Sequence, residues 1–313
     1  MANAKNINGN NMSMNKIKDD SIKDRVISAF IYLIFGFYSF ICVYPFYYIF
    51  INTISNNKLS EKGAVIWFPK GVHIKNYLDA FNIPGIGNAA FISLSRTVIV
   101  TVLVVIISAF LGYMFTKETM WKRKIWFRFI IITMYFNAGI IPWYLTMMNL
   151  HLTNNFLGYV FPALVSPFYI LLTKTYLESL PKELQEAAEC DGAGTLTIFT
   201  KIIMPVSKPI LSTIAIFSAV TQWNSFQDTL LLMTQEKLFT LQFILYRYLQ
   251  SSQSLMAIVN ATSGSAAAAL ANAQTQTSIR MTVTIIVAMP ILLVYPFFQK
   301  FFVKGIMIGA VKG

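Results

Sequence analysis

The sequence predicts an all-helical protein that spans a membrane six times, and its composition and the spacing of its apolar runs both indicate this class. Hydrophobic residues make up 56% of the 313 residues, whereas charged residues make up only 12%. A chain this apolar is typical of a polytopic membrane protein, because a soluble domain of this length needs a larger charged surface. Six apolar runs, each long enough to cross a bilayer, alternate with polar segments. The predicted fold class is therefore all-α, with six transmembrane helices.

The N-terminal part divides into a tail and a first span. Residues 1–25 are polar and rich in Asn and Lys, so we expect a disordered tail without a cleavable signal peptide. The first apolar run covers residues 26–54. At about 1.5 Å of rise per residue, this run is long enough to cross about 30 Å of hydrocarbon. We therefore expect it to be a transmembrane helix that is retained.

The later runs complete the membrane domain. They cover residues 89–115, 125–148, 156–176, 209–232 and 279–302. The whole transmembrane domain is predicted over residues 26–303, with a polar loop at 55–87, a long loop at 233–278 and a C-terminal tail at 304–313. In the span order, the polar stretch at 179–207 falls between the fourth and fifth helices.

The positive charges predict the orientation in the membrane. Cytoplasmic loops retain Lys and Arg, and most of the 25 such residues fall on the side that carries the N-terminal tail. Both termini and residues 179–207 are therefore expected in the cytoplasm, and the loop at 233–278 outside, in a multi-pass protein surrounded by lipid. The formal net charge of +12 follows from the same loops, so we expect no nucleic-acid partner.

The stretch at 179–207 is a polar segment between apolar runs. Five of the 13 acidic residues lie between Glu178 and Asp191. Pro181 suits a first helical turn, Gly192 suits the turn that ends a helix, and Thr195 can cap a second one. The pattern predicts a helix, a tight turn and another helix, and an amphipathic connector at the membrane surface explains it equally well.

Residue spacing within this stretch resembles a known motif. The triplet Glu186-Ala187-Ala188, then Gly192 after three residues, then Met204-Pro205, resembles the EAA loop in permease subunits of bacterial binding-protein-dependent ABC importers. The segment Asp191-Gly192-Ala193 is also typical of that family. The family usually has Leu where this chain has Met204, which is a volume-conserving apolar replacement.

Two further segments resemble one branch of the same family. Residues 290–313 and the segment Trp223-Asn224-Ser225-Phe226 are similar to carbohydrate-uptake permeases of the maltose type, especially those that import fragments of complex polysaccharides. The resemblance covers residues 22–313. It implies an ATP-driven importer for oligosaccharides, in which this chain forms half of the translocation pathway in a bacterial cell membrane.

The resemblance also implies partners and a coupling site. A homologous second permease, a cytoplasmic ABC ATPase dimer and an extracytoplasmic sugar-binding protein would complete the importer, and ATP and Mg²⁺ would be used by the ATPase. Residues 181–194 would form the coupling helix that sits in a groove of that ATPase. By resemblance, Glu186 supplies the acidic contact, Ala187 and Ala188 the small face, and Gly192, beside Asp191, the turn.

The sequence lacks the residues for enzymatic chemistry of its own. No G-x-x-x-x-G-K-[ST] loop is present, so this chain should bind no ATP, and we expect no catalytic residue, metal site or cofactor. The two histidines, His73 and His151, lie in different loops, which leaves no material for a metal cluster. Cys42 lies in a span and Cys190 in a cytoplasmic segment, so both are expected as free thiols.

Apart from the basic residues near run ends that the orientation assigns to the loops, the charged residues inside the apolar runs are Arg96 and Asp228. A carrier driven by protons or sodium ions needs a relay of such groups within the membrane. We interpret these two as a structural ion pair or an interfacial pair rather than an ion pathway. The hypothesis is that they pair across the second and fifth helices.

Sugar binding needs aromatic faces and hydrogen-bonding groups in a water-accessible space, which directs attention to polar and aromatic residues within the spans. The candidates are Tyr135, Asn137, Trp143 and Tyr144 in the third run and Gln222, Trp223, Asn224, Gln227 and Asp228 in the fifth. Each one is also a common packing or interface residue. Gly139 and Pro142 are expected to open the helix beside Asn137.

Other accounts of the chain remain open from the sequence. A self-sufficient secondary carrier or channel for a polar solute is the main alternative, and the lack of a buried acid relay argues against it. A membrane scaffold without transport is a third. The long loop at 233–278 is either a contact for the sugar-binding protein or a solvated loop with a short helix.

Overall fold

The computed structural model describes residues 22–250, 278–294 and 296, and within these ranges every regular element is a helix. The chain divides into two compact units, Met1–Ile49 and Phe50–Gly313. The predicted all-α fold class is confirmed. The tail at 304–313, most of the N-terminal tail and much of the loop at 233–278 lie outside the described residues.

The described part of the first unit is most of helix α1, which runs from Ile22 to Thr53. It begins slightly before the predicted start at residue 26, and it is long and apolar enough to cross a membrane. Its few charges lie at the N-terminal end, as expected for a helix whose interior is in hydrocarbon.

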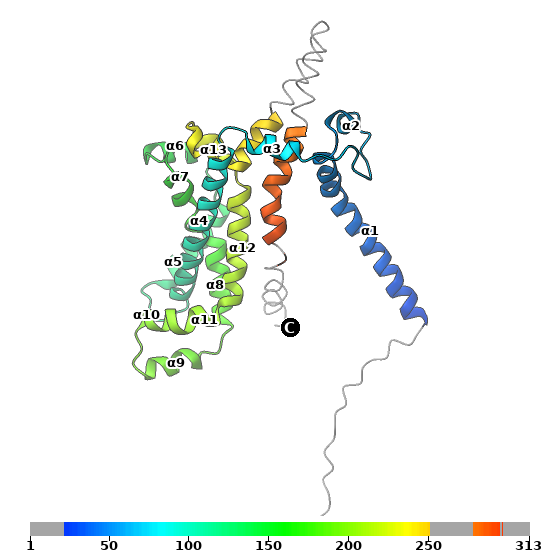
Figure 1. Cartoon of the computed structure of the whole chain (residues 1–313). Helices are drawn as coiled ribbons and strands as arrows, with labels where there is room; N and C mark the ends of the chain where they lie inside the picture. Colours follow the sequence, from blue (N-terminus) through cyan, green and yellow to red (C-terminus); the bar gives the residue numbers. More distant parts are fainter. Residues whose placement is uncertain (1–21, 251–277, 295, 297–313) are drawn as a thin grey trace, which may run out of the picture. The chain divides into compact units, whose positions relative to one another are not determined.

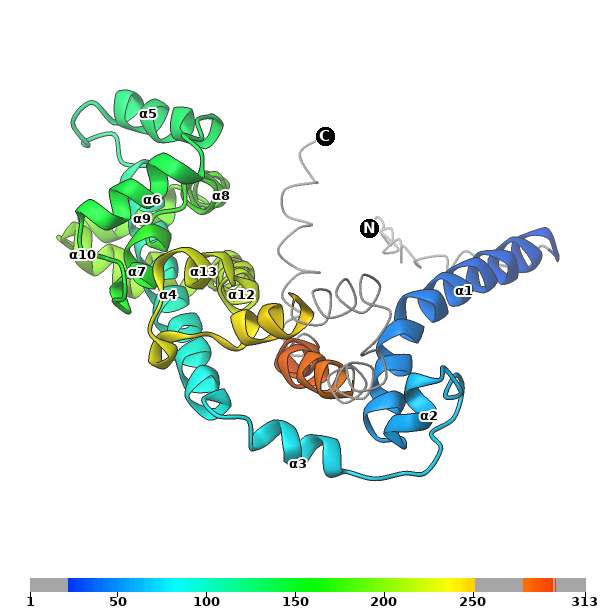
Figure 2. The same ribbon diagram turned by 90° about the horizontal axis from the view of Figure 1, so that it is seen from above.

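Three helices form the centre of the second unit. Helices α4 (Ile86–Met114), α8 (Pro167–Glu178) and α12 (Lys208–Asn224) lie side by side in Figures 1 and 2. Their shared core contains Val100, Val104 and Ile214, all almost fully buried. Gly112 allows α4 to approach α8 closely, because a Cβ atom at this position would lie only 2.7 Å from the Cβ of Thr173. The bundle is therefore built around α4.

Two of the apolar runs are broken into bent pairs of helices, and a third bent pair joins the stretch at 179–207 to the fifth run. Helix α5 (Arg123–Tyr135) meets α6 (Ile140–Asn149) at 120°, helix α7 (Leu157–Val160) with its 3₁₀ turn Phe161–Ala163 meets α8 at 46°, and the segment Thr195–Val206 meets α12 at 80°. Proline lies in the first turn of both α8 and α12, where its missing N–H is tolerated. The two prolines therefore favour a new helix beginning at each of these positions.

The third predicted span is the most strongly bent. Residues 136–139 are not helical, and Gly139 has a positive φ of 89°, which favours glycine. The opening expected beside Asn137 is confirmed, and a single continuous helix over 125–148 is not what forms. The six-span count stays a prediction, since two described helices qualify as spans alone, and up to five when each bent pair is one span.

The fifth predicted span is also interrupted, which the sequence did not indicate. Helix α12 ends at Asn224, Ser225 is extended, and α13 runs from Gln227 to Leu232. A single helix over 209–232 was expected and is wrong. The run contains no proline or glycine near Ser225, and the break is instead accompanied by the tertiary contacts of Arg96 described below.

The remaining elements are short. Helices α2 (Asn57–Glu61) and α3 (Lys75–Phe81) lie in the loop predicted at 55–87, and a 3₁₀ turn at Glu236–Leu238 and a helical segment at 241–250 follow α13. At the opposite end of the bundle from α13 lie α9 (Glu183–Cys190), α10 (Thr195–Ile198), a π-helical turn (Phe199–Ile203) and α11 (Met204–Val206). The sixth run is a helix over Ser278–Val294.

Candidate functional site

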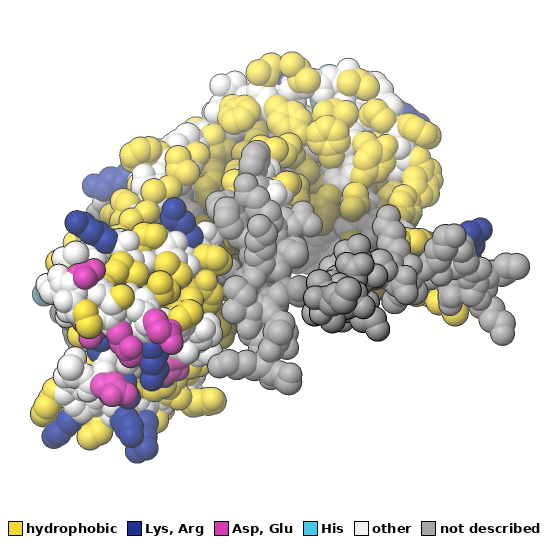
Figure 3. Space-filling model, turned by 90° about the horizontal axis from the view of Figure 1, so that it is seen from below, with side chains coloured by type: hydrophobic (Ala, Val, Ile, Leu, Met, Phe, Trp, Pro, Cys, Tyr) yellow, Lys and Arg dark blue, Asp and Glu magenta, His cyan; other side chains and the backbone are white. Residues whose placement is uncertain are grey.

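Helix α9 projects from one end of the bundle (Figure 1), and its sequence is rich in acidic residues. Glu183 and Glu186 lie in its first turn, where the helix dipole favours anions. Both are exposed, and Figure 3, which views this end, shows acidic and basic side chains gathered on one part of the face. Ala188 alone in this helix is buried, at 8% exposure, and it packs in the central core. The helix therefore has one small side against the bundle and a charged side turned outward.

A tight turn ends α9 as the sequence predicts. Gly192 has a φ of 78°, and its N–H donates to Glu189 O at 3.0 Å. The next residue, Ala193, donates to Ala188 O at 2.9 Å, so the last carbonyls of the helix have partners. Thr195 is the first residue of α10 and Gly194 occupies the capping position. The expected cap at Thr195 is therefore wrong, and the helix begins one residue earlier than predicted.

An ion pair ties α9 to the end of α4. Lys117 Nζ lies 2.5 Å from Glu189 Oε1, and it lies 5.1 Å from the centroid of the Tyr113 ring. Partial burial lowers the pKa of the Lys117 ammonium, but its hydrogen bond to the Glu189 carboxylate and the contact with Tyr113 outweigh burial, so the pKa of Lys117 is raised above its ordinary value. Together with buried Ala188, this pair anchors α9 to the central helix.

Arg96 and Asp228 pair across the second and fifth predicted spans, as hypothesised from the sequence. The Arg96 side chain is 1% exposed, and its guanidinium also donates from Nε to Gln222 Oε1 at 2.9 Å and lies 4.6 Å from the centroid of the Tyr159 ring. Asp228 is partly exposed, at 27%. Nη1 of Arg96 is buried without a hydrogen-bond partner among the described residues, but the ion pair and the bond to Gln222 hold the charge between α4, α12 and α13. This arrangement fits a structural role better than an ion pathway.

Tyr159 extends this polar cluster. Its hydroxyl is within hydrogen-bond distance of Thr229 Oγ1, at 2.9 Å, and donates to Leu238 O, at 2.7 Å. The cluster thus joins α4, α7, α12, α13 and the turn after α13. Sequence reasoning did not identify Tyr159, because an aromatic residue in an apolar run carries no local signal of its partners.

The sugar-contact candidates in the third run divide into two groups. Trp143 and Tyr144 are half-buried and pack against the cluster that contains Phe226 and Tyr159, so the broken third and fifth runs meet in one place. Tyr135 is 86% exposed at the end of α5, and Asn137 is exposed with its side-chain oxygen accepting from Gly139 N–H at 2.9 Å.

The fifth-run candidates are also separated by their contacts. Gln222 and Asp228 are engaged by Arg96, whereas the Trp223 indole donates to Val287 O at 2.9 Å. Asn224 donates to Val220 O at 2.9 Å and is exposed, as is Gln227. Asn137, Asn224 and Gln227 are therefore the polar candidates that are exposed beside helix breaks.

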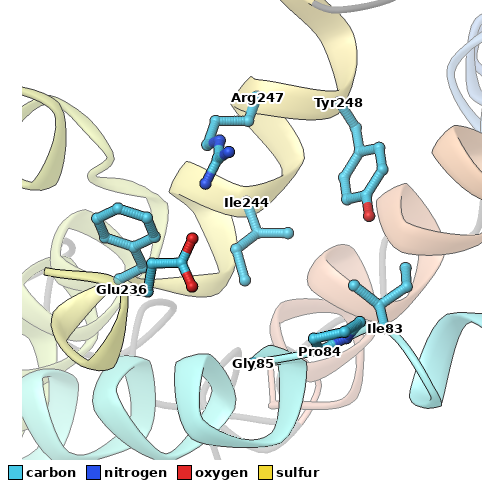
Figure 4. Close-up of a pocket in the computed structure, with 8 residues that line it drawn as sticks. Ile83, Pro84, Gly85, Glu236, Ile244, Arg247 and Tyr248 are labelled. Carbon is cyan, nitrogen blue, oxygen red and sulfur yellow. The ribbon is translucent and has the colours of Figure 1, made fainter. Parts of the chain in front are cut away.

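A cavity of about 340 Å³ lies at the end of the bundle away from α9. Its lining comes from residues 83–85 before α4, from Glu236 and Phe239 around the 3₁₀ turn, and from Ile244, Arg247 and Tyr248 in the helix that follows (Figure 4). These residues are distant in sequence, and the sequence gives no motif that would collect them.

The described residues contain no group of three or more His, Cys, Asp or Glu side chains that can hold a metal ion. Cys42 and Cys190 are free and exposed thiols. The arrangement is therefore a helical membrane bundle with broken spans, a buried charge cluster and an anchored acidic helix at one end.

Residues 105–308 match the family described as the binding-protein-dependent transport system inner membrane component. The chain belongs to this family. The broken helices and the helix–turn–helix at residues 183–198 are thus features of a transport permease.

Several bacterial relatives align with almost the whole permease. It is 30% identical to Protein LplC of Bacillus subtilis (strain 168) over 289 residues, covering 92% of this chain and 96% of LplC. It is 27% identical to the polygalacturonan/rhamnogalacturonan transport system permease protein YtcP of the same organism, covering 93% and 100%. The arabinooligosaccharides transport system permease protein AraQ of Halalkalibacterium halodurans is 26% identical, covering 92% and 98%.

A solved structure has the same fold. A chain in the crystal structure of a bacterial ABC transporter involved in the import of the acidic polysaccharide alginate superposes with a TM-score of 0.78 and 28% sequence identity. The match covers 90% of this permease and 98% of that chain.

Proposed function

We propose that this permease is the membrane subunit of an ATP-driven importer for oligosaccharides released from complex polysaccharides. Family membership and relatives named for polygalacturonan, arabinooligosaccharide and alginate transport support this substrate class. The chain forms half of the pathway beside a homologous permease, and a sugar-binding protein delivers the substrate from outside. ATP and Mg²⁺ belong to the ATPase partner.

The observation that carries the proposal is the anchoring of α9. Its acidic face is exposed, while Ala188 and the Lys117–Glu189 pair fix it to the core that contains α4, α8 and α12. A force applied to α9 by a closing ATPase dimer is therefore transmitted directly to the central helices. Such transmission is needed to convert the permease between inward-facing and outward-facing states. In this proposal α9 is the coupling helix, Glu186 contacts the ATPase, and α9 and both termini are cytoplasmic.

The helix breaks support a pathway through the bundle. Non-helical backbone at membrane depth is tolerated where it is covered by protein or lines a water-filled space. Asn137, Asn224 and Gln227 are exposed beside two such breaks, so they are the residues we propose to contact sugar hydroxyl groups. Tyr135, Trp143, Tyr144 and Trp223 would supply aromatic surface near them.

Reconstitution tests the proposal against the alternative of a secondary carrier. The permease, its paired permease, the ATPase and the binding protein are placed in proteoliposomes, and uptake of labelled oligogalacturonide is measured. We expect uptake that requires both ATP and the binding protein. Equal uptake in vesicles that lack ATP or the ATPase subunit would overturn the proposal in favour of a carrier or channel.

A further inference from the structure

The cavity at the end away from α9 contains two opposite charges that do not pair with each other. Figure 4 shows the Glu236 carboxylate and the Arg247 guanidinium extending toward the same space. Within the part of the chain that the structure describes, neither group belongs to an ion pair. An acceptor and a cationic donor that share a cavity without neutralising each other are available to a ligand with groups that complement both.

The walls of this cavity are held by the rest of the bundle. Asn88 on α4 donates to Lys237 O at 2.7 Å, and Ser93 on α4 accepts from Leu241 N–H at 2.9 Å, so both ends of the segment that carries Glu236 are attached to the central helix. On the next helix, Ile244 is buried in the cluster that contains Ile86. The cavity is thus formed by anchored elements, which favours binding by a preformed site.

The side chain of Arg247 is held in place by a neighbouring aromatic ring. Its guanidinium lies 5.6 Å from the centroid of the Phe239 ring, within the range of a cation–π contact. A guanidinium presents two parallel N–H donors that match the two oxygens of a carboxylate. Both side chains are exposed, so water solvates them when the cavity holds no ligand. An anion alone would engage only Arg247, whereas a ligand that also carries hydroxyl groups engages Glu236 as well.

The remaining lining is apolar or aromatic. Pro84 and Ile244 supply aliphatic surface, and Tyr248 supplies an aromatic side chain, which suits the C–H face of a sugar ring. The volume of about 340 Å³ lies at the lower end of the range for small-molecule sites, so it suits a single ring better than a long segment. A sugar ring that carries a carboxylate and vicinal hydroxyl groups complements Arg247, Glu236 and the apolar lining together.

We infer that this cavity is a binding subsite for an acidic sugar unit, with the carboxylate on Arg247 and hydroxyl groups donating to Glu236. The inference rests on the proposed function, because it assumes that oligosaccharides reach this end of the permease. It adds a site outside the spans and narrows the substrate class to saccharides that contain uronic acid units.

Galacturonate and galactose form a matched pair of probes, since they differ only in the carboxylate or hydroxymethyl group at carbon 6. Saturation-transfer NMR on the assembled importer in nanodiscs, without the binding protein, measures both. We expect galacturonate to bind more tightly than galactose, and Arg247→Gln to weaken galacturonate binding by about tenfold or more. Glu236→Gln should weaken both sugars, because it removes a charged acceptor for hydroxyl groups.

Lys237→Gln is the control, because Lys237 is an exposed cation beside Glu236 that does not line the cavity. Equal binding of the two sugars, or equal losses in Arg247→Gln and Lys237→Gln, would overturn the subsite. A third outcome would also overturn it: Arg247→Gln binds galacturonate as the wild type does, but needs a higher concentration of binding protein to stimulate the ATPase. That outcome would assign the cavity to docking of the binding protein. Binding requires no transport, so failure of ATP-driven uptake leaves this measurement intact.

Discussion

The guanidinium of Arg96 forms an ion pair with Asp228 and also donates to Gln222, so one side chain from α4 bridges the break between α12 and α13. Gln222 lies in the last turn of α12 and Asp228 in the first turn of α13. The two helix ends are therefore held at a fixed spacing by a buried cation rather than by continuous backbone hydrogen bonds.

Replacing Arg96 should destabilise the permease strongly. Arg96→Met leaves Asp228 without its partner, and breaking a buried pair in this way typically lowers the free energy of unfolding by about 3–5 kcal/mol. We expect the lower part of that range, because Asp228 is 27% exposed and remains partly hydrated. Thermal unfolding of the purified protein in detergent measures the loss.

A double variant and a surface pair provide the controls for Arg96. Arg96→Met with Asp228→Leu should recover part of the stability, since no uncompensated charge remains. Glu178→Gln removes the exposed pair with Lys174 and should change stability by only about 0.3–0.5 kcal/mol. Equal losses in the single and double Arg96 variants would refute an account based on the charge pair.

Two nearby glycines distinguish backbone strain from the effect of added side-chain volume in the turn that ends α9. Gly192 has a φ of 78°, and an alanine there is disfavoured by about 1–2 kcal/mol. Gly194 has a φ of −70° and open space around its Cα, so Gly194→Ala should be tolerated. We expect Gly192→Ala to lower the amount of sugar imported per ATP hydrolysed, while membrane insertion is unchanged.

Gly192→Pro should be more severe, because it also removes the N–H that donates to Glu189 O. Uptake and ATP hydrolysis are measured together in proteoliposomes. Normal coupling in Gly192→Pro would show that residues 183–198 are not the coupling element.

The Lys117–Glu189 pair gives a pH dependence of stability. The pKa of Lys117 is raised above the ordinary value of 10.5, so its contribution is fully present below about pH 10.5 and is lost as pH rises through the folded-state pKa. The difference in thermal midpoint between the wild type and Lys117→Gln should be constant from neutral to mildly alkaline pH and should shrink only above that value. A difference that already shrinks near neutral pH would contradict the pairing.

Gly112 tests the close contact between α4 and α8. A Cβ atom there would lie 2.7 Å from Thr173 Cβ, so Gly112→Ala should destabilise the protein by about 1–3 kcal/mol through overpacking. Gly87 lies in the same helix, and a Cβ atom added there would meet no neighbouring atom within 4 Å, so Gly87→Ala should be neutral or slightly stabilising. Similar thermal midpoints for the two variants would contradict the packing described.

Local chemistry made several features predictable from the sequence. The acidic first turn and Gly192 predicted α9 and its end, and Gly139 with Pro142 predicted the opening beside Asn137. Arg96 and Asp228 were recognisable because isolated charges in apolar runs need partners. Each of these predictions depends on residues whose local conformation or solvation is restrictive.

Other features depend on contacts between distant residues. The break at Ser225 has no proline or glycine near it, and it is bridged by Arg96 from another helix. The cavity between Glu236 and Arg247 brings together residues whose individual patterns indicate only a solvated loop. Periodicity describes each helix alone, so neither feature can be predicted from it.

The two exposed thiols give this permease a natural spectroscopic label. Cys190 is the last residue of α9, and Cys42 lies within the apolar helix α1. A membrane-impermeant maleimide dye should therefore react at Cys190 in open membrane sheets while lipid shields Cys42. Fluorescence from that single dye would report the motion of α9 during each cycle of ATP hydrolysis without any engineered residue.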